Sequence, residues 1–309
     1  GFFFGIFPVI GVIMALSDNL RGALYMNVSM AAFTINDTFM KKVTQTVPLY
    51  QSIALRGLIA LVALMILARF FLGGFSIPKG KDRPLVLWRA GFEVISIVAF
   101  LSALMFLPLA NLSAILQFLP LAITLTSALL LGTKIGWRRM SAIMVGFLGV
   151  MLIIKPGAEG FDQYSLMGLA AVVAIVGRDL VTRHISDQVS SVTVAIFAAV
   201  SVMTLGFVGV IFQGWQSITL YEGFYILGAA TALVAGYLFA VMVMRAGDIG
   251  FIAPFRYMSL LWAIMLGWLF FDTLPDAVTV LGAAIVVSMG TFALFRERYF
   301  ALKGARGAA

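Results

Sequence analysis

A series of apolar runs, most of them about 20 residues long, constrains this chain more than any other feature of its sequence. A helix that crosses about 30 Å of hydrocarbon needs roughly 20 apolar residues. The chain is 62% hydrophobic and 11% charged, whereas a soluble domain has about 25% charged residues. The runs are continuous and do not alternate as the strands of a membrane barrel would. We therefore predict an all-α integral membrane protein.

We expect ten transmembrane helices with short connections and no soluble domain. Residues 1–13 are apolar, but as a helix they reach only about 20 Å, and Pro8 interrupts them. Residues 1–19 are thus predicted to be an N-terminal extension or an interfacial segment, with an eleventh span as the alternative. The ten spans are expected near residues 21–42, 49–71, 85–107, 110–131, 138–154, 166–185, 190–212, 223–244, 250–271 and 277–295.

The positive charges predict the orientation, because lysine and arginine collect on the cytoplasmic side of a membrane protein. With the first span starting in the cytoplasm, fifteen of these residues lie inside and only Lys41, Lys42 and Lys155 lie outside. Both termini are then cytoplasmic, and the net charge of +8 reflects topology rather than a nucleic-acid partner. The fifteen are Arg21, Arg69, Lys79, Lys81, Arg83, Arg89, Lys134, Arg138, Arg139, Arg183, Arg245, Arg296, Arg298, Lys303 and Arg306.

The two halves of the chain resemble each other. Residues 36–42, which end the first span, correspond to residues 178–184, which end the sixth, and Gly146 is matched with Gly282. Five spans per half is an odd number, so the second half is inverted in the membrane, as in many transporters with a substrate site near the midplane. The predicted units are a first repeat at 20–155, a second at 166–296 and a basic cytoplasmic tail at 297–309.

Polar residues within the spans are the candidate cavity residues, because a charge at membrane depth costs about 2.5–3.5 kcal/mol on insertion scales. Three acidic and three basic residues lie at such depth, and several neutral polar residues form a stripe with Asp37 and Lys41 on the first span. The candidate substrate-binding residues are Asn27, Thr34, Asp37, Thr38, Arg56, Glu93, Gln117, Arg178, Asp179, Arg256, Tyr257 and Trp262.

Structural roles remain open for several of these residues. Arg178 and Asp179 could form an ion pair, and Glu93 could pair with Arg89 one turn away. Arg56 could extend toward the membrane surface, since it lies only two turns into its span. Asp37 is the strongest functional candidate, because it is the only acidic residue on its polar stripe.

The ninth span is predicted to pack closely against a neighbour. Ser259, Ala263 and Gly267 lie four residues apart on the face that also carries Arg256. Small residues at this spacing let helices approach closely in lipid.

Composition excludes several functions. The chain has no cysteine and a single histidine, so we expect no metal site and no cofactor. It lacks a GxxxxGK loop and the motifs of membrane-embedded hydrolases, which leaves an enzyme as a remote alternative.

Three stretches resemble the drug/metabolite transporter superfamily, specifically the EamA-type ten-helix carriers. They are Arg56 within IALRGLIALVAL, residues 103–125, and residues 256–287 with their arginine-tyrosine, glycine-tryptophan and acidic-x-proline pattern. The resemblance covers residues from about 20 to 300. One departure is Thr133, where the family often has a glutamate after the glycine.

The resemblance implies two EamA repeats in the bacterial inner membrane and alternating access without a cofactor. Similar members include amino-acid exporters of the YddG type, and uptake carriers for S-adenosylmethionine or riboflavin are the alternative. The expected partners are a small-molecule substrate, the lipid bilayer and a coupling proton, with no nucleic acid, and the protein is expected to be a monomer or a weak dimer. A zwitterion would suit the site, with Asp37 or Glu93 at its ammonium and an arginine at its carboxylate.

Overall fold

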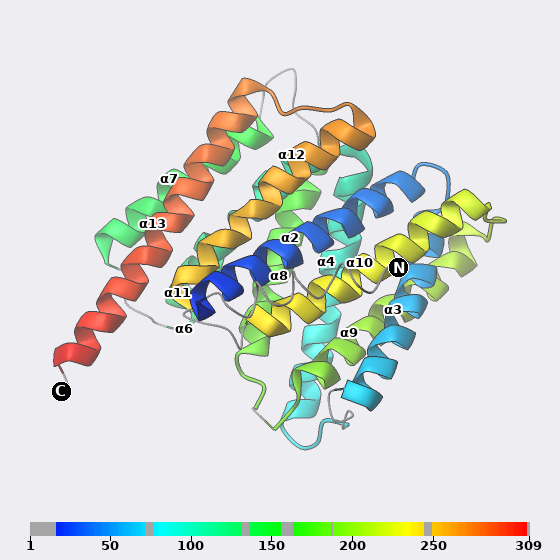
Figure 1. Ribbon diagram of the computed structural model, residues 1–309, viewed down its shortest axis with the longest axis horizontal. Helices are drawn as coiled ribbons and strands as arrows, with labels where there is room; N and C mark the ends of the chain where they lie inside the picture. The colour runs from blue at the N-terminus through cyan, green and yellow to red at the C-terminus, as the bar shows by residue number, and fades with distance from the viewer. Residues whose placement is uncertain are drawn as a thin grey trace.

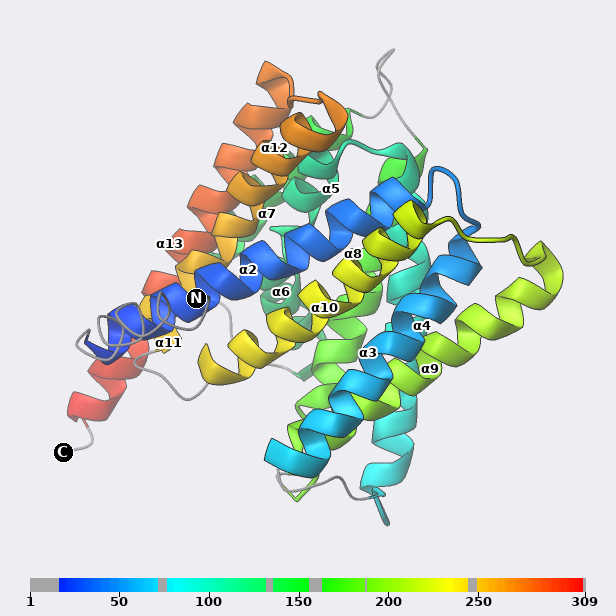
Figure 2. The same cartoon turned by 45° about the vertical axis from the view of Figure 1, so that its right-hand side comes forward.

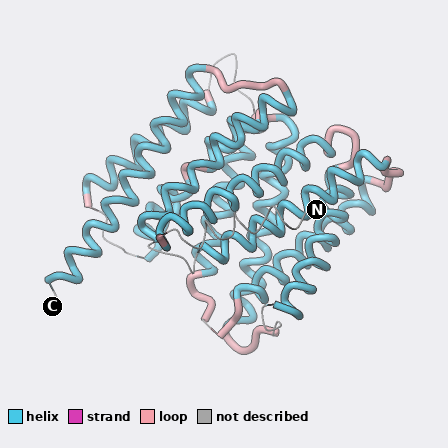
Figure 3. The backbone as a smooth tube through the Cα atoms, viewed as in Figure 1, coloured by secondary structure: helices cyan, strands magenta, loops and turns pink. Residues whose placement is uncertain are grey.

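The computed structural model describes residues 17–71, 77–131, 136–155, 163–186, 188–243 and 249–307. These residues form helices and short connections without any strand (Figure 3), which confirms the all-α prediction. The proposed N-terminal extension lies outside the described residues up to Leu16.

The helices follow the expected spans closely. Among the described residues, eight spans are long and apolar enough to cross a membrane, and α7 contributes a shorter apolar helix. The first span, α2, has 26 residues and carries the polar stripe. The helices are α2 (Asp18–Val43), α3 (Leu49–Phe71), α4 (Asp82–Phe106), α5 (Leu109–Leu116), α6 (Leu119–Leu131), α7 (Trp137–Ile154), α8 (Tyr164–Thr182), α9 (Ser191–Gln213), α10 (Leu220–Val243), α11 (Ile249–Ile252), the 3-10 helix η1 (Ala253–Tyr257), α12 (Met258–Phe271) and α13 (Ala277–Gly307).

The helix pairs repeat in a two-fold pattern. Helix α2 packs on α10, and its counterpart α8 packs on α4, which is the counterpart of α10. Helices α3 and α9 pair with each other on one flank, and α7 and α13 pair on the opposite flank (Figures 1 and 2). Exchanging the first five spans for the last five therefore leaves the set of main contacts unchanged.

Two acidic residues at the starts of corresponding helices lie at opposite ends of the bundle. Asp82, at the start of α4, accepts hydrogen bonds from the backbone N–H and hydroxyl of Ser186, at 3.0 and 2.7 Å, just after α8. Glu222, at the start of α10, accepts hydrogen bonds from Thr219 and lies close to Thr46, just after α2. Because α2 and α8 run in opposite directions, this placement is that of an inverted repeat.

The fourth and ninth spans are both broken, and the breaks touch. The fourth changes from α5 to α6 at Gln117, and the ninth passes through η1, which contains Pro254. Proline has no backbone N–H to continue a helix. The Gln117 side chain donates to the Ser259 hydroxyl at 2.8 Å and so bridges the two breaks.

Small residues set the closest helix contacts. A Cβ on Gly282 would lie 2.6 Å from the carbonyl oxygen of Gly149, and a Cβ on Gly149 would lie 2.9 Å from that of Gly282. This reciprocal contact favours Gly149, rather than the predicted Gly146, as the counterpart of Gly282, a shift of one helical turn. On the ninth span, Ala263 and Gly267 are buried as predicted.

Gly206→Ala is expected to destabilise the protein by about 1–3 kcal/mol, the usual range for overpacking. Its Cβ would lie 2.5 Å from the backbone nitrogen of Ala54 in α3, and helix backbone cannot move aside as a flexible side chain can. Thermal unfolding in detergent measures the effect. Gly91→Ala in α4 is the control, because nothing lies within 4 Å of its new Cβ. Equal melting temperatures for the two variants would contradict this contact.

Orientation in the membrane stays a prediction based on the positive charges. Reporter fusions placed within residues 73–84 and after Arg298 are expected to read cytoplasmic. Fusions within residues 155–165 and 272–276 should read periplasmic. A periplasmic C-terminus would refute the ten-span topology.

The C-terminal helix extends beyond the predicted tenth span. Helix α13 continues to Gly307, so most of the segment predicted as a separate tail is helical. At its other end, Lys155 hydrogen-bonds Asp276, and this bond, together with the N–H of Thr279, holds the pKa of the Asp276 carboxyl below its usual value. The contact ties the end of α7 to the start of α13.

Candidate substrate site

The first polar group of the site joins α2 and α3. Arg56 donates to the side-chain oxygen of Asn36 at 3.1 Å, and the Asn36 amide donates to Asp37 at 2.9 Å. Arg56 is only 3% exposed, so it does not extend to the membrane surface. Asn36 therefore lies between the arginine and the carboxylate, and Asp37 has partners that its position on the stripe did not suggest.

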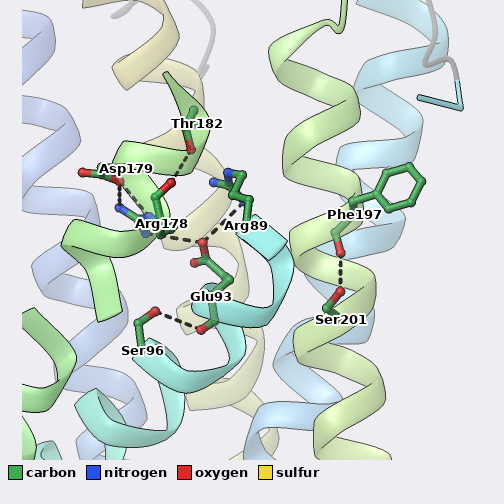
Figure 4. A network of polar contacts seen from close by, with 8 residues as sticks. All are labelled: Arg89, Glu93, Ser96, Arg178, Asp179, Thr182, Phe197 and Ser201. Carbon is green, nitrogen blue, oxygen red and sulfur yellow. Dashed lines mark hydrogen bonds and ion pairs between the residues drawn. The ribbon is translucent and has the colours of Figure 1, made fainter. Parts of the chain in front are cut away.

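The second polar group joins α4 and α8, and Figure 4 shows it from close by. Glu93 points toward two arginines, with Arg178 at 3.4 Å and Arg89 at 3.5 Å. Arg178 also contacts Asp179 at 2.8 Å. Both structural pairings left open by the sequence are thus present, but they form one cluster that links the two halves of the chain.

Tyr237 of α10 connects the two groups. Its hydroxyl interacts electrostatically with Glu93, Arg178 and Arg56, and Arg56 also interacts with Glu93. The Tyr237 ring packs edge-on against Phe33 of α2 at 5.5 Å between ring centroids. The two polar groups are therefore within electrostatic range of each other.

Arg56 keeps an unused hydrogen-bond donor within the first polar group. Its Nε is buried without a hydrogen-bond partner, and no carboxylate of the described residues forms an ion pair with it. Arg178, in contrast, contacts two carboxylates. A buried guanidinium with unused donors suits a planar anion such as a carboxylate.

Other candidate residues are occupied in packing. The Trp262 indole donates to Asn27 at 3.0 Å. The hydroxyls of Thr34 and Thr38 donate to carbonyls one turn back on their own helix, at 2.8 and 2.7 Å. Back-bonding of this kind satisfies a buried hydroxyl without any ligand.

Gln117 and Tyr257 belong to the contact between the two broken helices. Gln117 reaches Ser259 and approaches the Tyr257 carbonyl at 3.5 Å. The Tyr257 hydroxyl lies over Gly290 of α13, where it is buried without a hydrogen-bond partner.

Arg256 differs from expectation. It lies in the 3-10 helix, and its side chain is exposed. A 3-10 helix has about three residues per turn, so the α-helical face that carries Ala263 and Gly267 does not continue back to Arg256.

Lys41 ends the polar stripe in a structural role. Its ammonium donates to the carbonyls of Leu104 and Leu107 at 2.5 and 2.7 Å. The helical partner of the Leu104 carbonyl would be residue 108, which is a proline without an N–H. Lys41 thus replaces the missing donor at the end of α4.

The first half of the chain matches a known family. Residues 20–155 match the model described as the EamA-like transporter family. A relative that aligns with most of the chain agrees with this match. The chain is 24% identical over 276 residues to the pseudopaline exporter CntI of Pseudomonas aeruginosa, covering 89% of this chain and 96% of that protein. The family match and this relative support the drug/metabolite transporter superfamily for this chain.

Further transporters are similar to this chain over long regions. The S-adenosylmethionine uptake transporter of Rickettsia prowazekii is 21% identical, covering 92% of this chain and 96% of that protein. A riboflavin transporter of Vibrio cholerae is 29% identical over 203 residues, covering 65% of this chain and 68% of that protein. A chain in a solved crystal structure covers 91% of this chain and 98% of its own length, with 19% identity and a TM-score of 0.61, which supports the fold. These relatives are transporters rather than enzymes.

Two residues that contact or lie near these polar groups, Arg89 and Tyr237, were missed as candidates. Arg89 was assigned to the cytoplasmic surface, yet its side chain is 14% exposed and contacts Glu93. Tyr237 carries a hydroxyl within an apolar run. This polar group could have identified Tyr237 as a candidate from the sequence. Arg89 precedes Glu93 by four residues on α4, so the two side chains share one helical face and can pair.

Proposed function

We propose that this protein is a secondary active carrier of small zwitterionic metabolites, with amino acids as the expected substrates. It would export them across the bacterial inner membrane by alternating access, with both termini in the cytoplasm. The observation that carries the proposal is the buried, incompletely paired Arg56 beside Asn36 and Asp37. This group offers a cation and an anion to one small ligand.

In this proposal the substrate carboxylate binds Arg56, and its ammonium lies near Asp37. Two parallel N–H···O bonds to a guanidinium are stronger and more directional than a single neutral bond. The Glu93 cluster supplies the opposing wall from the other repeat. Relative movement of the repeats would expose the site to one side and then to the other.

Uptake of a larger nitrogenous metabolite is the alternative, and similarity to the S-adenosylmethionine and riboflavin transporters favours it. S-adenosylmethionine also carries an amino-acid end, so Arg56 and Asp37 could bind it in the same way. Trp262 is bonded to Asn27, and Tyr257 is buried against Gly290. The buried Tyr257 ring is not free to stack on a large heterocycle, and this favours the smaller substrate.

Transport of a labelled amino-acid panel in proteoliposomes, with and without a proton gradient, tests the proposal. We expect Asp37→Asn to keep the fold, because the amide is nearly isosteric, and to lower transport at least about tenfold, or roughly 1.4 kcal/mol. If Asp37 carries the coupling proton, the variant loses pH dependence but still exchanges substrate. If it binds the ammonium, exchange and net flux fall together.

Thr34→Val is the matched control on α2, since its hydroxyl bonds only to its own helix. It should transport at nearly the normal rate. Poor expression of Asp37→Asn combined with normal transport by the surviving protein would remove Asp37 from the site. An amino-acid panel without any transported member would refute the substrate class.

A further inference from the structure

A groove of about 770 Å³ lies where the C-terminal ends of α2 and α12 meet. It is on the side of the molecule where Lys155 pairs with Asp276, and it is separate from the Glu93 cluster. Its lining residues are Lys41, Lys42, Gln45, Trp268, Leu269, Phe270, Phe271, Asp272 and Thr273. The volume falls within the range of ordinary ligand pockets, about 300–1,000 Å³.

The groove contains one available cation. Lys41 and Lys42 both approach the Phe271 ring, at 5.5 and 5.9 Å from its centroid. The Lys41 ammonium is occupied by the carbonyls at the end of α4, and the side chain is 8% exposed. Lys42 is more exposed and forms no ion pair with any carboxylate in the described ranges. It is therefore free to bind an anion.

An apolar track leads from the groove along α12. Leu261, Met265, Trp268 and Leu269 are 57%, 43%, 57% and 65% exposed, respectively. They recur at three- and four-residue steps on one helical face. In a membrane protein such a face contacts lipid chains, and tryptophan is typical of the level of the headgroups. The groove thus lies at the bilayer surface, with acyl chains available directly below it.

We propose that this groove is a phospholipid site selective for an ethanolamine headgroup. The phosphate binds the Lys42 ammonium, and one acyl chain lies along the α12 track. The exposed carboxylate of Asp272 at the rim faces the ammonium of the headgroup. The pairing of one lysine with one acid matches the two charges of phosphatidylethanolamine, whereas phosphatidylglycerol offers no cation to Asp272. This inference does not depend on the transported substrate.

The test uses delipidated full-length protein in detergent, with short-chain phosphatidylethanolamine, phosphatidylglycerol or diacylglycerol added to the micelles. Phosphatidylethanolamine is expected to raise the melting temperature by about 4 °C more than diacylglycerol does. Lys42→Gln should abolish this difference. Asp272→Asn should equalise the two phospholipids, and asparagine tolerates the positive φ of 52° at this position.

Lys155→Gln is the control, because it removes a cation at the same end of the molecule but outside the groove. It should keep the full response to phosphatidylethanolamine. Native mass spectrometry of the unmutated protein provides a second measurement and should detect retained phosphatidylethanolamine in preference to phosphatidylglycerol. An undiminished response of Lys42→Gln, an equal effect of diacylglycerol, or retention without preference would overturn the proposal.

Discussion

Arg56→Gln is expected to lower transport about 10- to 100-fold while leaving the protein folded. Hydrogen bonds to charged groups contribute about 1.5–3 kcal/mol, and each 1.4 kcal/mol corresponds to a factor of ten. Arg56 is buried and bonded to Asn36, with a donor left over for substrate. Initial rates and half-saturation concentrations in proteoliposomes measure the effect.

Two further variants show whether the geometry or only the charge of Arg56 matters. Arg56→Lys keeps the charge but loses the planar pair of donors, so it should recover only part of the activity. Arg69→Gln on the same helix is the matched control, since Arg69 is exposed near the end of α3. Normal transport by Arg56→Gln would refute its role as the carboxylate anchor.

Glu93→Gln is expected to cost about 3 kcal/mol of stability, as breaking a buried ion pair from one side usually does. The change would leave Arg89 and Arg178 facing each other without the carboxylate that both contact. Thermal unfolding in detergent should show a decrease of several degrees. Asp179→Asn should cost less, because the Asp179 side chain is 31% exposed and solvent screens its contribution.

A double variant separates a lost pair from a general packing defect. Adding Arg178→Gln to Glu93→Gln removes one of the two like charges that face each other, so part of the lost stability should return. Strictly additive losses in the double variant would show that the two side chains do not stabilise each other. Unchanged stability in Glu93→Gln alone would contradict a structural role for the cluster.

Sequence reasoning located the candidate charges but not their partners. Asp37 and Arg56 were recognised because a charge within an apolar run is costly. Their connection through Asn36 depends on how α2 and α3 approach each other, which no spacing along the chain specifies. Arg256 was chosen for the same reason, and a continuous helix was expected to place it on the face of Ala263 and Gly267. The 3-10 turn at residues 253–257 instead leaves its side chain exposed.

The apolar pattern was enough to predict the class of fold, the number of spans and most of their limits, because hydrocarbon thickness and backbone hydrogen bonding constrain each span locally. Which polar residues meet depends on how the helices pack. Glu93 binds Arg178 from 85 residues away, and Lys41 caps the end of α4 from across the bundle. Such contacts depend on helix crossings that are set by close contacts such as Gly149 with Gly282, and a hydropathy pattern carries no information about them.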